Sequence, residues 1–316
     1  MELKDYKPGD ESEILALFEI VFKQKLKLDN WYWRFRDNPA GQYMIKLMWD
    51  KDRLIGHYAV SPTNMTVENQ QILTAHSLTT MTHPDYGGKG IFKTLSKAMY
   101  HDLENNHNCK AIWGFPNNNS HYGFIKRLEW KNLVVLHTLG LDFNQLNPKD
   151  IQFKVREICK FDDNHQAFIS SKIRNFAIVN IKNNTSYLNW RFIKKPNSNY
   201  FCFEFDHDSS KAILIVKPYL LKNIKTHQLN ILACYMEDFE RLHDYILHIT
   251  KVLKLKFSSI TLWQNIFNPD HLEFERQGFV PVLPQTYLAS RVHPSMPTSF
   301  SDFRNWDISM SYSDVF

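Results

Sequence analysis

The stretch from His83 to Phe92 reads HPDYGGKGIF and joins an apolar run typical of a long strand, Ile72 to Thr82, to an amphipathic run typical of a helix, Ile91 to Glu104. Three glycines directly before a helix let the backbone take positive φ and approach a ligand, while the first N–H groups of the helix lack partners within it. The positive end of a helix favours anions, and Lys89 adds a mobile positive charge. The loop therefore indicates a phosphate or pyrophosphate site, with a tight turn that binds nothing as the alternative.

Two other glycine-rich phosphate motifs do not fit this loop. A Walker A motif ends in Gly-Lys-Ser or Gly-Lys-Thr, whereas Gly90 follows Lys89 here. The dinucleotide motif Gly-x-Gly-x-x-Gly needs a spacing that Gly87, Gly88 and Gly90 do not have. Both of these nucleotide-binding folds lose support.

The chain repeats itself, and the loop is present in one copy only. The tripeptide Trp-Arg-Phe occurs at 33–35 and again at 190–192, each time followed by a proline and then by a tyrosine that opens a strand-like run. A second match pairs the strand-like runs around Trp113 and Trp263, and copy two passes from Tyr235 almost directly into its helix. Since the tripeptide also occurs in the copy without the loop, we interpret it as architectural rather than as a platform for a sugar or a base.

Both copies predict the same order of elements: a helix, a strand pair, a long strand and a second helix. In copy one these are Glu11 to Phe22, Met44 to Trp49, Leu54 to Val60, Ile72 to Thr82 and Ile91 to Glu104. In copy two they are His165 to Ile178, Phe201 to Phe205, Ala212 to Val216, Leu229 to Tyr235 and Phe239 to Leu253.

This order predicts an α/β fold with two tandem domains, each a mixed, mostly antiparallel sheet flanked by helices. We expect the first domain, with the loop, at 1–148 and a second, degenerate domain at 149–293. The remaining residues, 294–316, are polar but carry aromatic side chains that a disordered tail would usually lack, so we expect this tail to dock on the domains.

Composition limits the classes of function. A chain of 316 residues is long enough for two domains, and 43% hydrophobic residues are enough for a core, which excludes disorder and low complexity. The 38 Lys and Arg residues against 33 Asp and Glu give a net charge of +5, but they are scattered along the chain. We therefore expect no nucleic-acid partner.

The cysteines and the N-terminus bear on the compartment. The four cysteines are far apart and form no Cys-x-x-Cys pair, so neither a metal site nor a disulfide framework is indicated. The first ten residues, MELKDYKPGD, lack the apolar core of a signal peptide, and no apolar run is long enough for a membrane helix. We expect a soluble, cytoplasmic protein without a membrane partner, and a homodimer is left open.

The loop and its surroundings resemble the GNAT family of acyl-CoA-dependent N-acyltransferases. That family's signature, Q/R-x-x-G-x-G/A between a long strand and a helix, has the same frame as Asp85 to Gly90. Gly88 and Gly90 match it, whereas Asp85 stands where the family prefers Gln or Arg. A second family element, an Asn-containing turn before a helix that ends in Gly-Phe or Gly-Trp, is similar to Phe115 to Trp130, with Glu129 in place of the glycine. The repeat would then be a tandem GNAT with a degenerate second copy.

The resemblance implies that acetyl-CoA or another acyl-CoA is the co-substrate, with no metal. The pyrophosphate would rest on the main-chain amides of the loop and helix start, and the pantetheine would run along the exposed edge of the long strand, held also by Asn117. The cofactor-binding residues implied in this way are Thr80, Met81, Thr82, Gly87, Gly88, Lys89, Gly90, Ile91, Phe92 and Asn117.

Direct attack of an amine on the thioester needs a base, stabilisation of the oxyanion and a proton for the thiolate. A GNAT base often lies on the long strand, where His76 is the only titratable side chain, with a hydrogen-bonded structural histidine as the alternative. Main-chain N–H groups near Thr80 would contact the oxyanion. The family's acid, a tyrosine in the closing helix, would fall at Ile125, so Tyr122 or its neighbour His121 is the substitute, unless the thiolate leaves without an enzymic acid.

Three interpretations of the acceptor follow from the resemblance. Tandem members with these elements look similar to bacterial acyltransferases of nucleotide-linked amino sugars. The leading acceptor is therefore a nucleotide-linked amino deoxy sugar, dTDP-linked above all. Such an enzyme would act in the synthesis of lipopolysaccharide or another surface polysaccharide. The first alternative is N-acetylation of a peptide, polyamine or aminoglycoside, which would favour an acidic cleft. The second is a non-catalytic CoA-binding sensor, which Asp85 and Ile125 favour.

Overall fold

The computed structural model describes residues 1–174 and 177–315, and the chain divides into two compact units. Unit 1 consists of Met1–Val134, Lys194–Asn197 and Tyr287–Ser301. Unit 2 consists of Val135–Ile193, Ser198–Thr286 and Asp302–Phe316. Each unit therefore includes segments from distant parts of the sequence.

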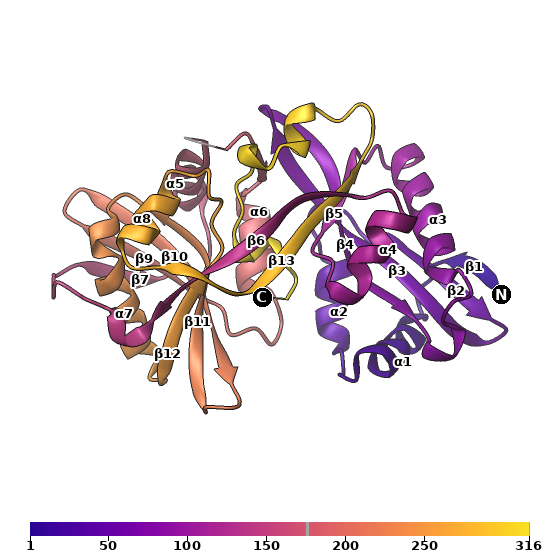
Figure 1. The fold of residues 1–316 in the computed structure, drawn as a ribbon, viewed down its shortest axis with the longest axis horizontal. Coiled ribbons are helices and arrows are strands. Elements are labelled where there is room, and N and C mark those ends of the chain that lie inside the picture. Colours follow the sequence, from indigo (N-terminus) through magenta and orange to yellow (C-terminus); the bar gives the residue numbers. More distant parts are fainter. Residues whose placement is uncertain (175–176, 316) are drawn as a thin grey trace. The chain divides into compact units, whose positions relative to one another are not determined.

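Unit 1 contains the Gly-rich loop. Its elements are β1 (Glu2–Asp5), α1 (Glu11–Phe22), α2 (Leu28–Phe35), β2 (Ile45–Asp50), β3 (Arg53–Val67), β4 (Gln70–Thr82), the 3-10 turn η1 (Pro84–Tyr86), α3 (Ile91–Asn105), β5 (Ala111–Gly114), α4 (Asn118–Arg127) and the 3-10 turn η5 (Thr298–Ser301) (Figure 1). The strands follow the order β1-β2-β3-β4-β5, and the last residues of β13 (Val280–Val292) pair with β5. The pairing of β4 with β5 is parallel, and the other pairings described in this unit are antiparallel.

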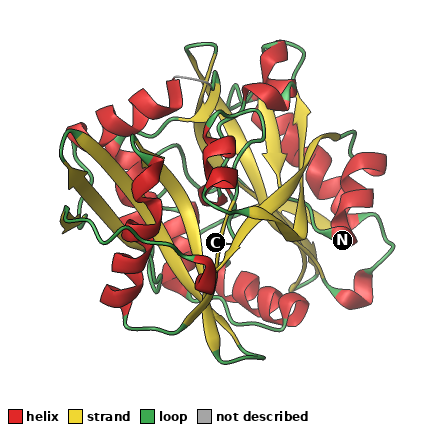
Figure 2. Cartoon of the chain, turned by 60° about the vertical axis from the view of Figure 1, so that its left-hand side comes forward, coloured by secondary structure: helices red, strands yellow, loops and turns green. Residues whose placement is uncertain are grey.

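The helices of unit 1 cover both faces of its sheet, because successive side chains of a strand point to opposite faces. Ile14 of α1 and Trp31 of α2 share one buried cluster with Ala59 of β3. Tyr58, the residue before Ala59 in β3, lies in a second cluster with Leu95 of α3 and Phe124 of α4. Figure 2 shows strands with helices packed along them. Burial of these two apolar faces holds β4 and its loop in place.

Unit 2 repeats this architecture. Its elements are β6 (Lys131–Asp142, which begins in unit 1), the 3-10 turn η2 (Phe143–Gln145), β7 (Lys154–Glu157), α5 (Asp163–Arg174), β8 (Val179–Ile181), α6 (Thr185–Leu188), the π-helical turn η3 (Asn189–Ile193), β9 (Phe201–His207), β10 (Ser210–Leu221), β11 (Thr226–Met236), the 3-10 turn η4 (Phe239–Arg241), α7 (Leu242–Leu253), β12 (Phe257–Leu262), α8 (Asp270–Arg276) and the 3-10 turns η6 (Phe303–Asn305) and η7 (Met310–Tyr312). Its strands follow the order β7-β9-β10-β11-β12-β6, again with a parallel pair, β11 with β12.

The two units therefore have the same strand order, and the predicted α/β class is confirmed, with one large mixed sheet flanked by helices. The last strand of each order comes from the other half of the sequence, since β13 completes unit 1 and β6 completes unit 2. The predicted helix His165 to Ile178 begins two residues earlier, at Asp163, and residues 175–176 within it lie outside the described part of the chain.

The strand predicted at Leu54 to Val60 is longer than expected, because β3 runs on to Val67. Two polar residues that follow Val60, Ser61 and Thr63, are buried and hydrogen-bonded: the Asn38 amide donates to the Ser61 hydroxyl at 2.8 Å, and the Thr63 hydroxyl donates to the Ser61 carbonyl at 3.2 Å. Satisfied polar groups can continue a buried strand.

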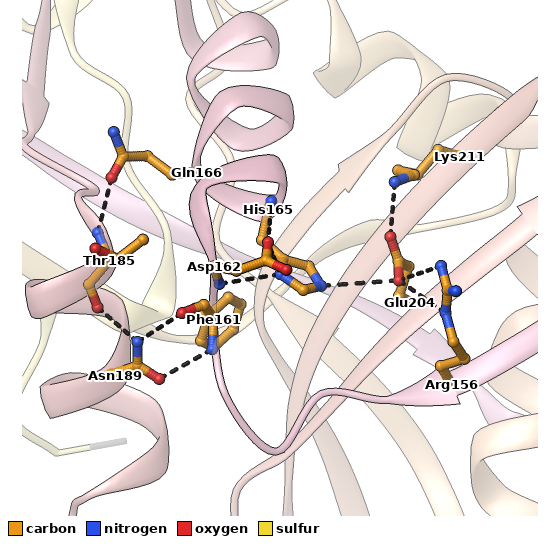
Figure 3. Close-up of polar contacts among 9 residues, drawn as sticks. All are labelled: Arg156, Phe161, Asp162, His165, Gln166, Thr185, Asn189, Glu204 and Lys211. Atoms are coloured by element: carbon orange, nitrogen blue, oxygen red, sulfur yellow. Dashed lines mark hydrogen bonds and ion pairs between the residues drawn. The ribbon is translucent and has the colours of Figure 1, made fainter.

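A charged network in unit 2 joins α5 to the sheet (Figure 3). Glu204 of β9 is 5% exposed and pairs with Arg156 at 2.8 Å and Lys211 at 2.7 Å. His165 of α5 lies between Asp162 at 2.6 Å and Glu204 at 3.7 Å. Burial opposes ionisation of Glu204, but the hydrogen bond from Lys211 and the other cations hold its pKa below the ordinary value. Because these charges are paired with one another, the network has a structural role.

The second Trp-Arg-Phe tripeptide is architectural, as expected. Arg191 is buried, and its guanidinium donates to the main-chain carbonyls of Ser311 and Ser313 at 3.2 and 3.1 Å and to the Tyr200 hydroxyl at 2.7 Å. Trp306, from the same C-terminal segment, is fully buried. Arginine is suited to this work because it carries five donors and stays charged.

None of the helices in the described residues is both long and apolar enough to cross a membrane.

Candidate active site

Strands β4 and β5 separate in the middle of unit 1. Ala75 pairs with Ile112 and His76 with Trp113, after which β5 ends at Gly114 while β4 continues to Thr82. The side of β4 that faced β5 is therefore left as a strand edge over its last residues. Such an edge presents main-chain N–H and C=O groups to which an extended ligand with amides can add.

A β-bulge lies on this part of β4. His57 of β3 pairs with Met81 and Ala59 pairs with Leu78, so that Tyr58 alone opposes two residues, Thr79 and Thr80. Thr79 has φ of +51°, in the left-handed region that a β-branched residue rarely adopts. A bulge of this kind re-aims the backbone beside functional sites.

The Gly-rich loop follows directly. The turn η1 brings the chain to Gly88 and Gly90, both at φ of +76°, and Gly90 is the residue before α3. A Cβ added at either glycine would have no neighbour within 4 Å, so the space on that side of the loop is open. The start of α3 has no side-chain cap and no acidic residue in its first turn. Its N–H groups and its dipole are thus available to an anion.

The charges around the loop are arranged by side chains on β2 and β3. Arg53 of β3 lies 3.7 Å from the Asp85 carboxylate and 6.0 Å from the centre of the Tyr86 ring. Lys89 lies 4.4 Å from the centre of the same ring, and the Tyr86 hydroxyl donates to Asp50 at 2.7 Å. This hydrogen bond lowers the pKa of the Asp50 carboxyl, which therefore stays ionised and anchors Tyr86. Two cations, Arg53 and Lys89, thus lie at the loop together with two carboxylates, those of Asp50 and Asp85.

In unit 2, the turn η4 directly before α7 is capped by an acidic side chain. Asp238 accepts a hydrogen bond from the Glu240 main-chain N–H at 2.9 Å, and Glu240 lies in the first turn of η4. A capping carboxylate and a second negative charge disfavour a phosphate there. In unit 1, by contrast, no carboxylate caps the start of α3, and the first turn of α3 has no acidic residue.

His76, the predicted base, lies on β4 next to the separation of the strands. Its ring stacks on Trp113, with 4.6 Å between the ring centres and 7° between the planes, and meets Phe115 edge-on at 5.8 Å. The side chain is buried, at 8% exposure. Among the predicted cofactor residues of the same strand, Met81 is buried while Thr80 and Thr82 are half-buried.

The predicted residues of the helix start differ in their surroundings. Ile91 is buried at 3% exposure and packs on Gly56, whereas Phe92 is half-buried and meets Phe124 edge-on at 5.3 Å. Asn117 caps α4: its side-chain oxygen accepts from the Asn119 and Ser120 N–H groups. Only the side-chain NH₂ of Asn117 remains for a ligand.

The two candidate acids on α4 lie in different environments. Tyr122 is 64% exposed. His121 stacks on Tyr287, with 3.9 Å between the ring centres, and its Nε2 lies 2.7 Å from the Asn132 side-chain oxygen. Ile125, at the position of the family's tyrosine, packs against the buried core. The structure therefore brings Tyr287 of β13 to the candidate acid, although it is far away in the sequence.

Sequence reasoning missed three residues of this site: Arg53, His57 and Tyr287. Arg53 follows a turn, His57 sits in an apolar strand, and Tyr287 lies in the second copy of the repeat. A buried histidine within an apolar strand is a signal that could have been noted in advance. The other two positions depend on strand pairing.

Comparison with known proteins agrees with this geometry. Residues 2–132 match the acetyltransferase (GNAT) domain family. The matched residues form most of unit 1. A domain of this family indicates an N-acetyltransferase enzyme, and it implies an acyl-CoA co-substrate. No curated protein matches the chain in sequence.

Solved structures extend the likeness over both units. A GCN5-related N-acetyltransferase from Anabaena variabilis aligns over 92% of this chain and 72% of its own, with 9% identity and a TM-score of 0.69. A probable N-acyltransferase from Enterococcus faecalis aligns over 92% and 72%, with 12% identity and a TM-score of 0.66. The N-myristoyltransferase of Saccharomyces cerevisiae, solved with myristoyl-CoA, aligns over 93% and 79%, with 9% identity and a TM-score of 0.62. At these identities the likeness concerns the fold, and it supports the expected GNAT fold.

Proposed function

We propose that this GNAT enzyme binds acyl-CoA along β4 and the loop of unit 1 and transfers the acyl group to the amino group of a nucleotide-linked amino sugar. The observation that supports the donor site is the continuity of the open edge of β4 with the uncapped start of α3. The pantetheine would pair with Thr80 to Thr82, and the pyrophosphate would meet the N–H groups of Gly87 to Phe92 and the ammonium of Lys89. The Asn117 NH₂ would hold the far side of the pantetheine.

Arg53 compensates in this proposal for the unusual Asp85. The family prefers Gln or Arg at the position of Asp85, and a carboxylate there would repel a pyrophosphate. Arg53 lies 3.7 Å from that carboxylate, so it neutralises the carboxylate and keeps a guanidinium beside the loop. The positive potential that the family places in the loop is supplied from the neighbouring strand.

The chemistry would take place where β4 and β5 separate. His76 would accept the proton of the attacking amine, and the stacked Trp113 would hold its ring in one plane. The Thr80 N–H would stabilise the oxyanion. Tyr122, or His121 held on Tyr287, would return a proton to the thiolate.

The proposal also includes the identity of the acceptor and the origin of the two units by duplication. The Trp-Arg-Phe and HPDYGGKGIF elements carry the preference for a dTDP-linked amino deoxy sugar of surface polysaccharide synthesis. We interpret 1–148 and 149–293 as the two copies of the duplication, the second degenerate, and 294–316 as a tail that packs on them. The shared strand order of the units supports a tandem arrangement.

The proposal is tested by free-thiol release from acetyl-CoA and longer acyl-CoAs against dTDP- and UDP-linked amino sugars, free amino sugars, polyamines and peptides. Turnover confined to nucleotide-linked sugars is the expected result. The Gly90→Glu variant should bind no CoA in calorimetry, because a carboxylate would enter the open space beside the loop. Binding of CoA without turnover by any acceptor would contradict the proposal and favour a sensor.

A second acceptor class has one observation in its favour. A pocket of about 580 Å³ in unit 2 is lined by four carboxylates, Glu237, Asp238, Asp270 and Glu273, against two cations, Lys172 and Arg276. An excess of carboxylates attracts cationic molecules. Turnover of a polyamine, peptide or aminoglycoside in the same panel would establish this alternative.

A further inference from the structure

The bulge on β4 is held from the neighbouring strand by a buried histidine. His57 of β3 has no exposed surface, and its Nδ1 lies 2.7 Å from the main-chain carbonyl oxygen of Thr79. A carbonyl only accepts hydrogen bonds, so Nδ1 carries the proton and donates it. Burial lowers the pKa of His57 to about 4, which keeps the ring neutral and leaves Nε2 without a proton.

This hydrogen bond fixes the direction of one peptide group. The carbonyl of Thr79 and the N–H of Thr80 belong to the same planar peptide and point in opposite directions. Holding the carbonyl toward His57 therefore directs the Thr80 N–H away from it. The left-handed φ of Thr79 is strained and persists only where the surroundings enforce it. His57 supplies one of the enforcing contacts.

Unit 2 provides an internal control, because its strand β11 also has a bulge with one extra residue, but no histidine on the neighbouring strand holds it. On β11, Ile231 pairs with Val216 and Ala233 with Ile215, so that Leu232 is the extra residue. No residue of β11 has a positive φ in the described structure. The segment of β10 beside this bulge, from Ile213 to Val216, is entirely apolar. The fold can thus form a bulge without a histidine and without a strained residue. The histidine and the strained residue occur together in the copy that retains the Gly-rich loop.

We infer that His57 is a positioning residue that aims the Thr80 N–H at the thioester carbonyl of acyl-CoA. This inference rests on the proposed donor site in unit 1. His57 acts through the peptide group and touches no reacting atom. Its removal should affect the transition state far more than the affinity for CoA, because the pyrophosphate contacts lie elsewhere.

Two substitutions separate this role from a role in folding. His57→Leu reproduces the apolar character of unit 2 and removes the donor, whereas His57→Asn keeps an N–H donor near the position of Nδ1. Thr250→Val is the matched control, since Thr250 is buried in unit 2 and donates to a main-chain carbonyl, that of Leu247, at 2.9 Å. Each variant is examined with acetyl-CoA labelled with ¹³C at the carbonyl, by calorimetry and by the infrared stretch of the bound carbonyl, and then with the acceptor found in the panel.

In the wild type and in Thr250→Val, the carbonyl stretching frequency of bound acetyl-CoA should be lower than that of free acetyl-CoA. His57→Leu should lose at least half of this shift and about 10- to 100-fold in kcat, with the Kd changed less than threefold, and His57→Asn should recover most of both. An unchanged shift and kcat in a folded His57→Leu would overturn the inference while leaving the donor site intact, as would equal losses in the His57→Leu and His57→Asn variants. Failure of the wild type to bind acetyl-CoA would overturn the donor site itself, and the inference with it.

Discussion

Alanine at Gly90 separates the cost of a strained backbone from the cost of a lost ligand contact. Gly90 has φ of +76° and Gly9, in the link between β1 and α1, has φ of +108°. At both positions an added Cβ would have no neighbour within 4 Å. The stability cost of either alanine is therefore backbone strain alone, about 1–2 kcal/mol at Gly90 and at least as much at Gly9, whose φ lies further from the left-handed helical region.

The two variants should differ in CoA affinity. A hydrogen bond to a charged group contributes about 1.5–3 kcal/mol, and the methyl group at Gly90 would prevent at least one amide from reaching the pyrophosphate. That loss corresponds to a Kd raised about 10- to 150-fold for Gly90→Ala, with the Kd of Gly9→Ala within twofold of the wild type. Calorimetry with CoA and thermal unfolding followed by circular dichroism measure the two effects separately. Equal affinities in the two variants, with equal losses of stability, would refute the placement of the pyrophosphate.

Three further outcomes are expected. His76→Ala should lower kcat by about 10²- to 10⁴-fold with the Kd for CoA retained, and a loss below tenfold would make His76 structural. Arg53→Gln should weaken CoA binding about tenfold, more at low salt than at high salt, whereas Asp85→Gln should strengthen CoA binding. Calorimetry at two salt concentrations checks both variants. Stronger binding by Arg53→Gln or weaker binding by Asp85→Gln would contradict the pairing of these residues. Burial raises the pKa of Asp307 from 3.8 to about 7, so the folded state keeps a proton that the unfolded state has lost, and stability should fall as pH rises between these values, by up to about 4 kcal/mol. Urea unfolding at pH 5 and pH 8 should show about 2–3 kcal/mol of this loss for the wild type and not for Asp307→Asn; equal pH dependence in both would disprove it.

Local patterns were sufficient to predict the elements and the donor loop. The helix at Glu11–Phe22 and the strand-loop-helix run through Thr82, the glycines and Ile91 follow from periodicity and from the conformational freedom of glycine, which act over a few residues. Repetition of Trp-Arg-Phe predicted that the chain contains two similar halves. Local patterns could not assign the last strand of each unit, because strand pairing joins residues that are distant in sequence.

The sequence by itself determined the α/β class, the GNAT resemblance and the position of the glycines that we propose to bind phosphate, since each of these depends on residues that are neighbours along the chain. Only the tertiary structure decided that Arg53 faces Asp85, that Tyr287 stacks on His121 and that His57 holds the Thr79 carbonyl. These contacts depend on the register of paired strands, and a shift of one residue would turn each side chain to the opposite face of the sheet.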